Sequence, residues 1–138
     1  MLAIENHDRL SSAVLKQIIE STSAESVGIC MDTANSLGAG EGIHEVMETL
    51  APYTVNLHIK DIIIKRISNK MGFTIEGAAA GQGMLDIPWM VNELKKTGKC
   101  ATATLESWSV KSGSIQSTVD KEHQVAETSI QYLKKILL

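Results

Sequence analysis

Four short apolar segments of this chain each end in a side chain that can bind a divalent cation. The four terminal residues are Glu5, Asp32, His58 and Glu106. Successive side chains of a strand point to opposite faces, so every second residue before each of them shares its face. That face is small and polar, with Ala3, Gly28, Cys30, Asn56, Thr102 and Thr104. The opposite phase is apolar enough to lie under helices, so the pattern predicts a metal-centred active site at the carboxyl ends of parallel strands.

The four candidate ligands combine carboxylate oxygens with one imidazole nitrogen. Such a set suits Mn²⁺, Mg²⁺, Co²⁺ or Zn²⁺ better than a soft, thiophilic ion. Taken alone, each residue has a structural alternative: a solvated strand end, a helix cap, a hydrogen-bonded core histidine or a salt-bridge partner. Their common phase and common position at strand ends favour the metal site.

Helical segments separate these strands. The predicted strands cover residues 2–5, 27–31, 55–58 and 101–106, and the predicted helices cover residues 11–21, 43–50, 87–96 and most of 118–138. Ser11 or Ser12 is the expected N-cap of the first helix, and Gly98 is the expected C-cap after the third. Strands that alternate with helices at intervals of about 25 residues indicate right-handed βαβ units and a parallel sheet.

The segment 61–86 breaks this alternation, because it is long for a connection between a strand and a helix and rich in glycine. Proteins of the α/β class place substrate loops in such connections at the carboxyl ends of strands. Within it, Gly81-Gln82-Gly83 permits a positive φ or a close approach of the backbone, which a substrate loop and an ordinary turn both need.

Four βα units make half of an eight-stranded barrel. An open doubly wound sheet is the alternative, but no Gly-x-Gly-x-x-Gly follows a strand. Strands covered by helices on both faces are apolar throughout, whereas one phase here is polar, as in a barrel lumen. We therefore predict a single domain over residues 1–138 of the α/β class, a parallel (βα)4 half of a TIM (β/α)8 barrel.

The bulk composition narrows the class of protein. A chain of 138 residues with a net charge of −3 does not favour nucleic-acid binding, since such domains are usually basic. No apolar run approaches the roughly 20 residues of a membrane span, and two cysteines fit a reduced protein. We expect a cytoplasmic protein.

Several local sequences carry a family resemblance. They are Ile4-Glu5-Asn6-His7, Met31-Asp32-Thr33-Ala34-Asn35, His58-Ile59-Lys60-Asp61, Gly81-Gln82-Gly83 through Asp86, and Leu105-Glu106. In this order they resemble the successive motifs of the xylose-isomerase-like TIM barrels, which include sugar and sugar-phosphate isomerases and epimerases, and endonuclease IV. The resemblance covers nearly the whole chain and corresponds to the C-terminal half of such an enzyme.

The resemblance implies that Glu5, Asp32, His58 and Glu106 bind the metal and that the two glutamates form the acid/base pair. The implied reaction is isomerisation or epimerisation of a small sugar or sugar phosphate, by carboxylate proton transfer through a metal-stabilised enediolate. Moving a proton between adjacent sugar carbons requires a polarised carbonyl and a carboxylate beside it, so the chemistry agrees.

Four further residues are expected to contact substrate: His7, Asn35, Lys60 and Arg66. Asn35 stands where related ketose epimerases carry a histidine, and an amide can bind a sugar hydroxyl but cannot titrate near neutral pH. Arg66 could bind a phosphate with two hydrogen bonds. The alternatives are a loop histidine bonded to backbone, a lysine paired with Asp61 and a solvated basic loop.

Two other interpretations stay open. The chain could be an endonuclease IV-like metal-dependent hydrolase, although such enzymes need more histidine ligands and a surface that binds DNA. It could also be a catalytically inactive half-barrel fragment. Four strands leave two open parallel edges, so under any interpretation we expect the chain to self-associate, for example as a dimer.

Overall fold

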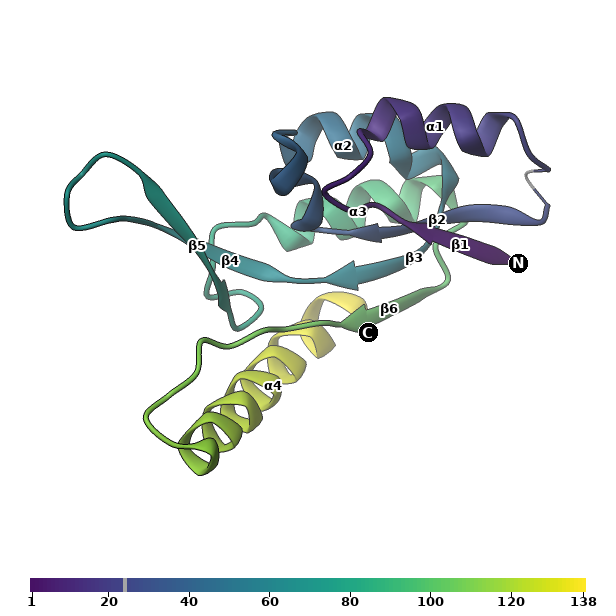
Figure 1. Ribbon diagram of the computed structural model, residues 1–138. Coiled ribbons are helices and arrows are strands. Elements are labelled where there is room, and N and C mark those ends of the chain that lie inside the picture. Colours follow the sequence, from purple (N-terminus) through teal and green to yellow (C-terminus); the bar gives the residue numbers. More distant parts are fainter. Residues whose placement is uncertain (24) are drawn as a thin grey trace. The chain divides into compact units, whose positions relative to one another are not determined.

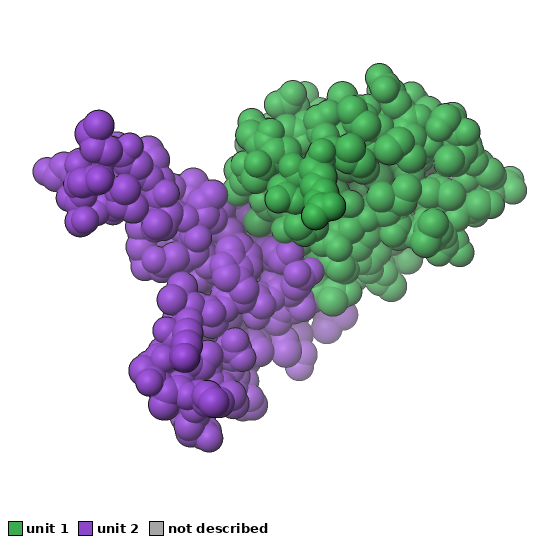
Figure 2. Space-filling view, in the orientation of Figure 1, with its two compact units in different colours: residues 1–59, 88–104 green, residues 60–87, 105–138 purple. Residues whose placement is uncertain are grey.

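The computed structural model describes residues 1–23 and 25–138. The chain divides into two compact units, residues 1–59 with 88–104 and residues 60–87 with 105–138 (Figure 2). The first unit contains most of the sheet and the second contains a hairpin, a loop and the last helix. Each is described separately below.

Strands and helices alternate along the first part of the chain, as predicted (Figure 1). The helices and strands are β1 (Leu2–Glu5), α1 (Ser12–Glu20), β2 (Val27–Asp32), η1 (Asn35–Ala39), α2 (Ile43–Leu50), η2 (Ala51–Tyr53), β3 (Thr54–Ile59), β4 (Asp61–Arg66), β5 (Phe73–Ala78), α3 (Ile87–Thr97), β6 (Thr102–Leu105) and α4 (Ile115–Leu137).

Four strands form a parallel sheet in the order β1-β2-β3-β6, which is the predicted half of a TIM barrel. The register pairs Glu5 with Cys30 and Asp32 with His58. One irregularity between Ile29 and Cys30 shifts the pairing of β2 with β3 before the ligand-bearing ends are reached. The carboxyl ends of the first three strands therefore lie at one edge of the sheet.

The apolar phase of the central strands is buried, as the alternation predicts. Ile29, Met31, Leu57 and Ile59 are at most 2% exposed. Leu15 and Ile19 of α1, Val46 and Leu50 of α2, and Met90 and Leu94 of α3 supply the helical side of the core. Each such side chain stabilises the fold by about 1.5–3 kcal/mol on burial. At the outer strand, by contrast, Leu2 is 66% exposed.

The helix ends follow local chemistry. The Ser11 side chain accepts a hydrogen bond from the Val14 backbone N–H and so caps α1, as expected. Gly98 after α3 has φ +66°, a conformation that glycine adopts without strain. Helix α4 begins at Ile115, three residues before the predicted start, because the Ser114 and Ser117 side chains form a reciprocal cap there.

The segment 61–86 contains an antiparallel hairpin that the sequence reasoning did not anticipate. Strands β4 and β5 pair from Asp61 with Ala78 to Arg66 with Phe73. A cross-strand ion pair joins Lys65 Nζ to Glu76 Oε2 at 2.7 Å. The β-branched run in β4 favours a strand, whereas the length and glycine content of the segment predict a loop.

Among the residues that the structure describes, no helix is both long and apolar enough to cross a lipid bilayer.

Candidate metal centre

Three candidate ligands come together at adjacent strand ends of the first unit. Glu5 is the last residue of β1, Asp32 is the last residue of β2, and His58 is one residue from the end of β3. Each offers one ligand atom, and these atoms lie within 4.8 Å of one another. A cation placed among them would be near all three. The shared strand phase therefore brings these side chains together at the strand ends, as predicted.

Asp32 is fixed by the turn that follows it. Its Oδ1 accepts hydrogen bonds from the backbone N–H groups of Ala34 and Asn35, both at 2.8 Å. The side chain is fully buried. These bonds fix the orientation of the carboxylate just before η1. Asp32 thus holds the turn at residues 32–35 with one oxygen, and its side chain remains part of the candidate ligand cluster.

Glu5 is held by a side chain from that same turn. Asn35 Nδ2 donates to Glu5 Oε1 at 3.0 Å, and His58 Nδ1 lies 3.5 Å from the same oxygen. The predicted substrate contact Asn35 therefore touches a candidate ligand. An asparagine can donate this bond at any pH, because its amide does not titrate.

The polar side chains of neighbouring strands contact one another on one face of the sheet. Cys30 Sγ donates to Asn56 Oδ1 at 3.1 Å, and Asn56 Nδ2 donates to Thr102 Oγ1 at 2.7 Å. This chain of contacts runs across β2, β3 and β6 in one direction. It places the predicted small, polar residues on one side of the sheet, behind the strand ends that carry the candidate ligands.

Glu106, the fourth candidate ligand, directly follows β6 and belongs to the second unit. There its Oε1 lies 2.7 Å from Lys60 Nζ, and the Lys60 side chain is 9% exposed. A lysine so deeply buried is stabilised by its carboxylate partner. The predicted alternative partner of Lys60 was Asp61, whose carboxylate has different contacts.

Asp61 organises the glycine loop before α3. Its carboxylate accepts hydrogen bonds from the backbone N–H groups of Gly81 and Gly83, both at 2.9 Å, and of Leu85 at 3.2 Å. A Cβ on Gly83 would lie 2.0 Å from Asp61 Oδ1, so the close approach requires glycine. Gly81 has φ +83°. The loop therefore uses glycine in both of the expected ways, for a positive φ and for a close approach.

Helix α4 packs on the same loop. The Ser129 hydroxyl accepts a hydrogen bond from the Ala80 backbone N–H at 2.9 Å and donates to the Val125 carbonyl. The Tyr132 ring lies against Gly81. Burial, with the nearby charges of Asp61 and Asp86, raises the pKa of the Tyr132 hydroxyl above its usual value. These contacts connect the last helix to the loop.

Two predicted substrate contacts lie at the surface of their units. His7 is exposed, and its Nδ1 lies 2.6 Å from Asp8 Oδ1, a contact that lowers the pKa of the Asp8 carboxyl. Arg66 stacks over the Phe73 ring at 4.5 Å and donates to the Lys70 carbonyl at 2.8 Å. The aspartate orients the His7 ring, and the hairpin orients the Arg66 guanidinium.

Sequence reasoning missed two residues that build these sites, Asn6 and Asp61. Asn6 is fully buried and bonds to the end of β2. Each follows a candidate site residue directly, Glu5 or Lys60. A polar residue just past a strand end is a signal that could have identified both.

The donor set fits a divalent cation. In the first unit it offers two carboxylates and one imidazole, the donors that Mg²⁺, Mn²⁺ and Zn²⁺ bind in proteins. No thiol is among them, so the composition favours the harder members of this group.

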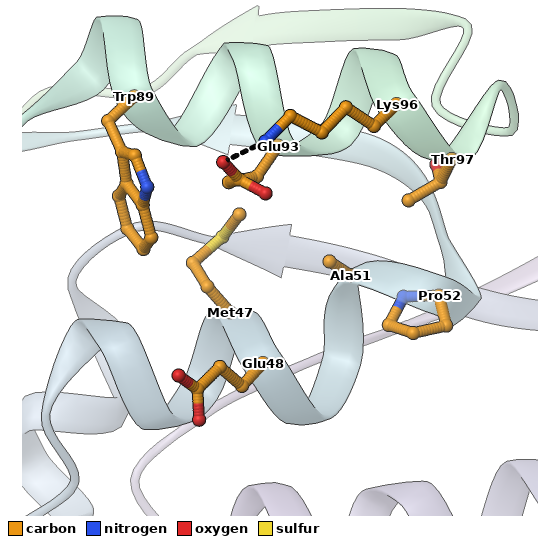
Figure 3. Close-up of a pocket in the computed structure, with 8 residues that line it drawn as sticks. All are labelled: Met47, Glu48, Ala51, Pro52, Trp89, Glu93, Lys96 and Thr97. Atoms are coloured by element: carbon orange, nitrogen blue, oxygen red, sulfur yellow. Dashed lines mark hydrogen bonds and ion pairs between the residues drawn. The ribbon is translucent and has the colours of Figure 1, made fainter.

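A separate groove of about 290 Å³ lies between α2 and α3 (Figure 3). Met47 and Pro52 line one side of it, and Trp89 and Glu93 line the other. The only ion pair drawn there joins Glu93 to Lys96 at 2.6 Å. None of the lining residues is a predicted site residue, so the groove is distinct from the metal centre.

The sequence and the fold of this chain resemble those of known proteins. Residues 1–136 match the family model described as "Xylose isomerase-like TIM barrel". A 3-oxo-isoapionate decarboxylase from Pectobacterium atrosepticum is 29% identical over 132 residues, which are 96% of this chain and 48% of that protein.

Two solved structures share the fold. A xylose isomerase domain protein from Planctomyces limnophilus has a TM-score of 0.73 and 20% identity, and the match covers 97% of this chain and 45% of that one. A xylose isomerase-like TIM barrel protein from Mycobacterium smegmatis, in complex with magnesium, has a TM-score of 0.66 and 13% identity over 94% and 44% of the two chains. The present chain thus spans about half the length of these proteins.

Proposed function

The chain belongs to the xylose isomerase-like TIM barrel family, and on that basis we propose that residues 1–138 form the C-terminal half of a divalent-metal-dependent sugar or sugar-phosphate isomerase or epimerase. The observation that carries the proposal is the meeting of Glu5, Asp32 and His58 at three neighbouring strand ends. Their side chains come from segments far apart in the sequence, and all three are metal-binding types.

The proposed metal ligands are these three residues and Glu106. Glu106 is the first residue after β6, the strand that neighbours β3 in the sheet. Mn²⁺, Mg²⁺, Co²⁺ and Zn²⁺ suit the donor set, and the magnesium in a protein of the same fold supports such an ion. When bound, the ion would polarise a substrate carbonyl.

Glu5 and Glu106 are the proposed acid/base pair that moves a proton between adjacent substrate carbons. Proton transfer requires a carboxylate held in a fixed orientation. Asn35 fixes Glu5 through its hydrogen bond, and Lys60 fixes Glu106 through the 2.7 Å contact. Asn35 lies in η1 and Lys60 lies between β3 and β4, so the two carboxylates are bound by different segments of the chain.

The proposed substrate contacts are His7, Asn35, Lys60 and Arg66. His7 follows the end of β1 by two residues in the sequence. Asn35 lies beside the end of β1 because its side chain donates a hydrogen bond to Glu5. Lys60 and Arg66 are cations that could bind a sugar hydroxyl, a carboxylate or a phosphate. The exposure of Arg66 suits a group at the outer end of a substrate.

A second candidate reaction is decarboxylation of a 3-oxo sugar acid. It is favoured by the 3-oxo-isoapionate decarboxylase, whose match covers 96% of this chain. Both reactions place negative charge on a carbonyl oxygen, so the same residues would serve either one. They differ in whether a proton or carbon dioxide leaves the neighbouring carbon.

The first prediction concerns metal binding. We expect metal-stripped protein to bind Mn²⁺ with micromolar or tighter affinity in a calorimetric titration. Asp32→Asn should weaken binding about 100-fold, since it removes one ligand charge while keeping the shape of the side chain. The matched control is Asp120→Asn on the exposed face of α4, which should leave the affinity unchanged.

If the unmodified chain binds no Mn²⁺, Mg²⁺, Co²⁺ or Zn²⁺, the inactive half-barrel interpretation replaces this proposal. If binding is confirmed, the loaded protein is incubated with ketoses, their phosphates and 3-oxo acids in D₂O. Deuterium incorporation at the carbon beside the carbonyl without release of carbon dioxide supports isomerase or epimerase chemistry. Release of carbon dioxide, with a solvent deuteron replacing the lost carboxyl group, supports decarboxylation.

Self-association through the sheet edges is also part of the proposal. Strands β1 and β6 are the outer strands of the sheet, and a parallel edge can pair with another strand. We expect light scattering to give a mass of at least two chains at micromolar concentration. Leu2→Lys on the exposed side of β1 should shift the protein toward monomer, because a charge disfavours edge pairing. A monomeric parent chain would contradict this expectation.

A further inference from the structure

Strand β1 ends at Glu5, but its pairing with β2 continues through a side chain. The Asn6 backbone N–H donates to the Cys30 carbonyl at 3.4 Å, which is the last main-chain bond between the two segments. Two residues further along β2, the backbone N–H and carbonyl of Asp32 point toward the place where β1 has already turned away. Both groups are buried and need partners.

The Asn6 amide supplies those partners. Its Oδ1 accepts from the Asp32 backbone N–H at 2.6 Å, and its Nδ2 donates to the Asp32 carbonyl at 3.0 Å. The side chain thus replaces the next residue of a strand. Only an amide of this length offers an acceptor and a donor to one backbone unit.

Asn6 also holds the turn that contacts Glu5. Its Nδ2 donates to Ser36 Oγ at 2.9 Å, and Ser36 lies in η1 beside Asn35. Asn35 Nδ2 donates in turn to Glu5 Oε1. The contacts therefore close a ring that starts at Glu5, passes through Asn6, Ser36 and Asn35, and returns to the Glu5 carboxylate.

We propose that Asn6 is a positioning residue that sets the spacing of the Glu5 and Asp32 carboxylates and so determines the metal affinity of the site. The inference rests on the proposed function, because it requires that these carboxylates bind a cation. Asn6 does not itself touch the metal or the substrate. It acts on both ligands at once, since its backbone continues from Glu5 and its side chain binds the Asp32 main chain.

The variant Asn6→Asp separates positioning of the two carboxylates from simple electrostatic attraction of the cation. Asn6→Asp keeps the size of the side chain and adds a negative charge near the site. Charge alone would attract a cation and tighten its binding. The change also removes the amide donor to the Asp32 carbonyl and to Ser36 Oγ, so loss of positioning should weaken binding instead.

The test measures Mn²⁺ affinity by calorimetry and the electron paramagnetic resonance spectrum of the bound ion. Ser36→Ala removes one hydroxyl from the ring and is the milder variant. The control for a purely structural effect is Thr54→Val, because the buried Thr54 hydroxyl bonds to the Leu50 carbonyl outside the ring. Circular dichroism selects a temperature at which all the variants are folded.

We expect Asn6→Asp to raise the Mn²⁺ dissociation constant at least tenfold and Ser36→Ala to raise it severalfold, the range seen when partners of metal ligands are removed. Both spectra should change shape, while Thr54→Val keeps the affinity and spectrum of the parent despite its lower stability. Parent-like affinity in Ser36→Ala and tighter or equal binding in Asn6→Asp would overturn the inference. If Asn6→Asp does not fold, Asn6→Ser takes its place beside Ser36→Ala. Absence of Mn²⁺ binding by the parent chain would overturn the proposed function itself, which is a different result.

Discussion

Replacing Glu106 with glutamine is expected to weaken Mn²⁺ binding about 100-fold, or by about 2.7 kcal/mol. Glutamine has the same shape but no charge, so the proposed metal site would lose one anionic ligand. The change also removes the partner of the buried Lys60 ammonium, and if Glu106 is a ligand as proposed, the remaining positive charge would oppose the cation. Both effects act in the same direction, and calorimetric titration measures their sum.

Glu76→Gln is the matched control for this variant. It makes the same chemical change and also removes the carboxylate partner of a lysine, Lys65, but on the hairpin. Its Mn²⁺ affinity should equal that of the parent. If Glu106→Gln binds Mn²⁺ as tightly as Glu76→Gln does, Glu106 is not a ligand and the site consists of the three residues from the first unit.

Asp61→Asn is expected to lower the free energy of unfolding by about 3 kcal/mol. The buried carboxylate accepts three backbone N–H bonds from the glycine loop and one from Ile62. Hydrogen bonds to a charged group contribute about 1.5–3 kcal/mol each. Asparagine retains a single acceptor oxygen and presents an NH₂ group to N–H donors, so more than one bond is lost.

Urea denaturation followed by circular dichroism measures this loss. Asp120→Asn serves as the reference again, because the Asp120 side chain has a hydrogen bond to Gln116 on the exposed surface of α4. Its effect should stay within about 0.5 kcal/mol. If Asp61→Asn changes the free energy of unfolding no more than Asp120→Asn does, the glycine loop does not depend on the Asp61 carboxylate.

The strands and the clustering of Glu5, Asp32 and His58 at their ends could be predicted, because both depend on short-range regularities. The alternation in residues 27–32 identifies the buried phase with Ile29 and Met31 and the polar phase with Cys30 and Asp32. A ligand at the end of each strand then lies at the edge where parallel strands finish. The burial of the apolar phase and the contact of Cys30 with Asn56 agree with this reasoning.

The β4–β5 hairpin and the hydrogen bonds made by Asn6 and Asp61 could not be predicted in the same way. Residues 62–64 are three isoleucines, which favour a strand, but the length and glycine content of the segment led to the prediction of a substrate loop. Asn6 and Asp61 bond to backbone groups that are 26 and about 20 residues distant. No local pattern indicates which distant N–H a buried side chain will meet, and the identity of such partners emerges only from the fold.

The contacts of Asp61 bear on how this protein could recognise a phosphorylated ligand. Backbone N–H groups that converge in a glycine-rich turn commonly hold a phosphate or another anion. Here the N–H groups of Gly81, Gly83 and Leu85, which are alternate residues, converge on an anion from the protein's own chain, the Asp61 carboxylate. A phosphate would have to displace the Asp61 carboxylate to reach these three donors. Recognition of a phosphorylated sugar would therefore depend on cationic side chains, and a ligand without a phosphate would need none of this loop's main chain.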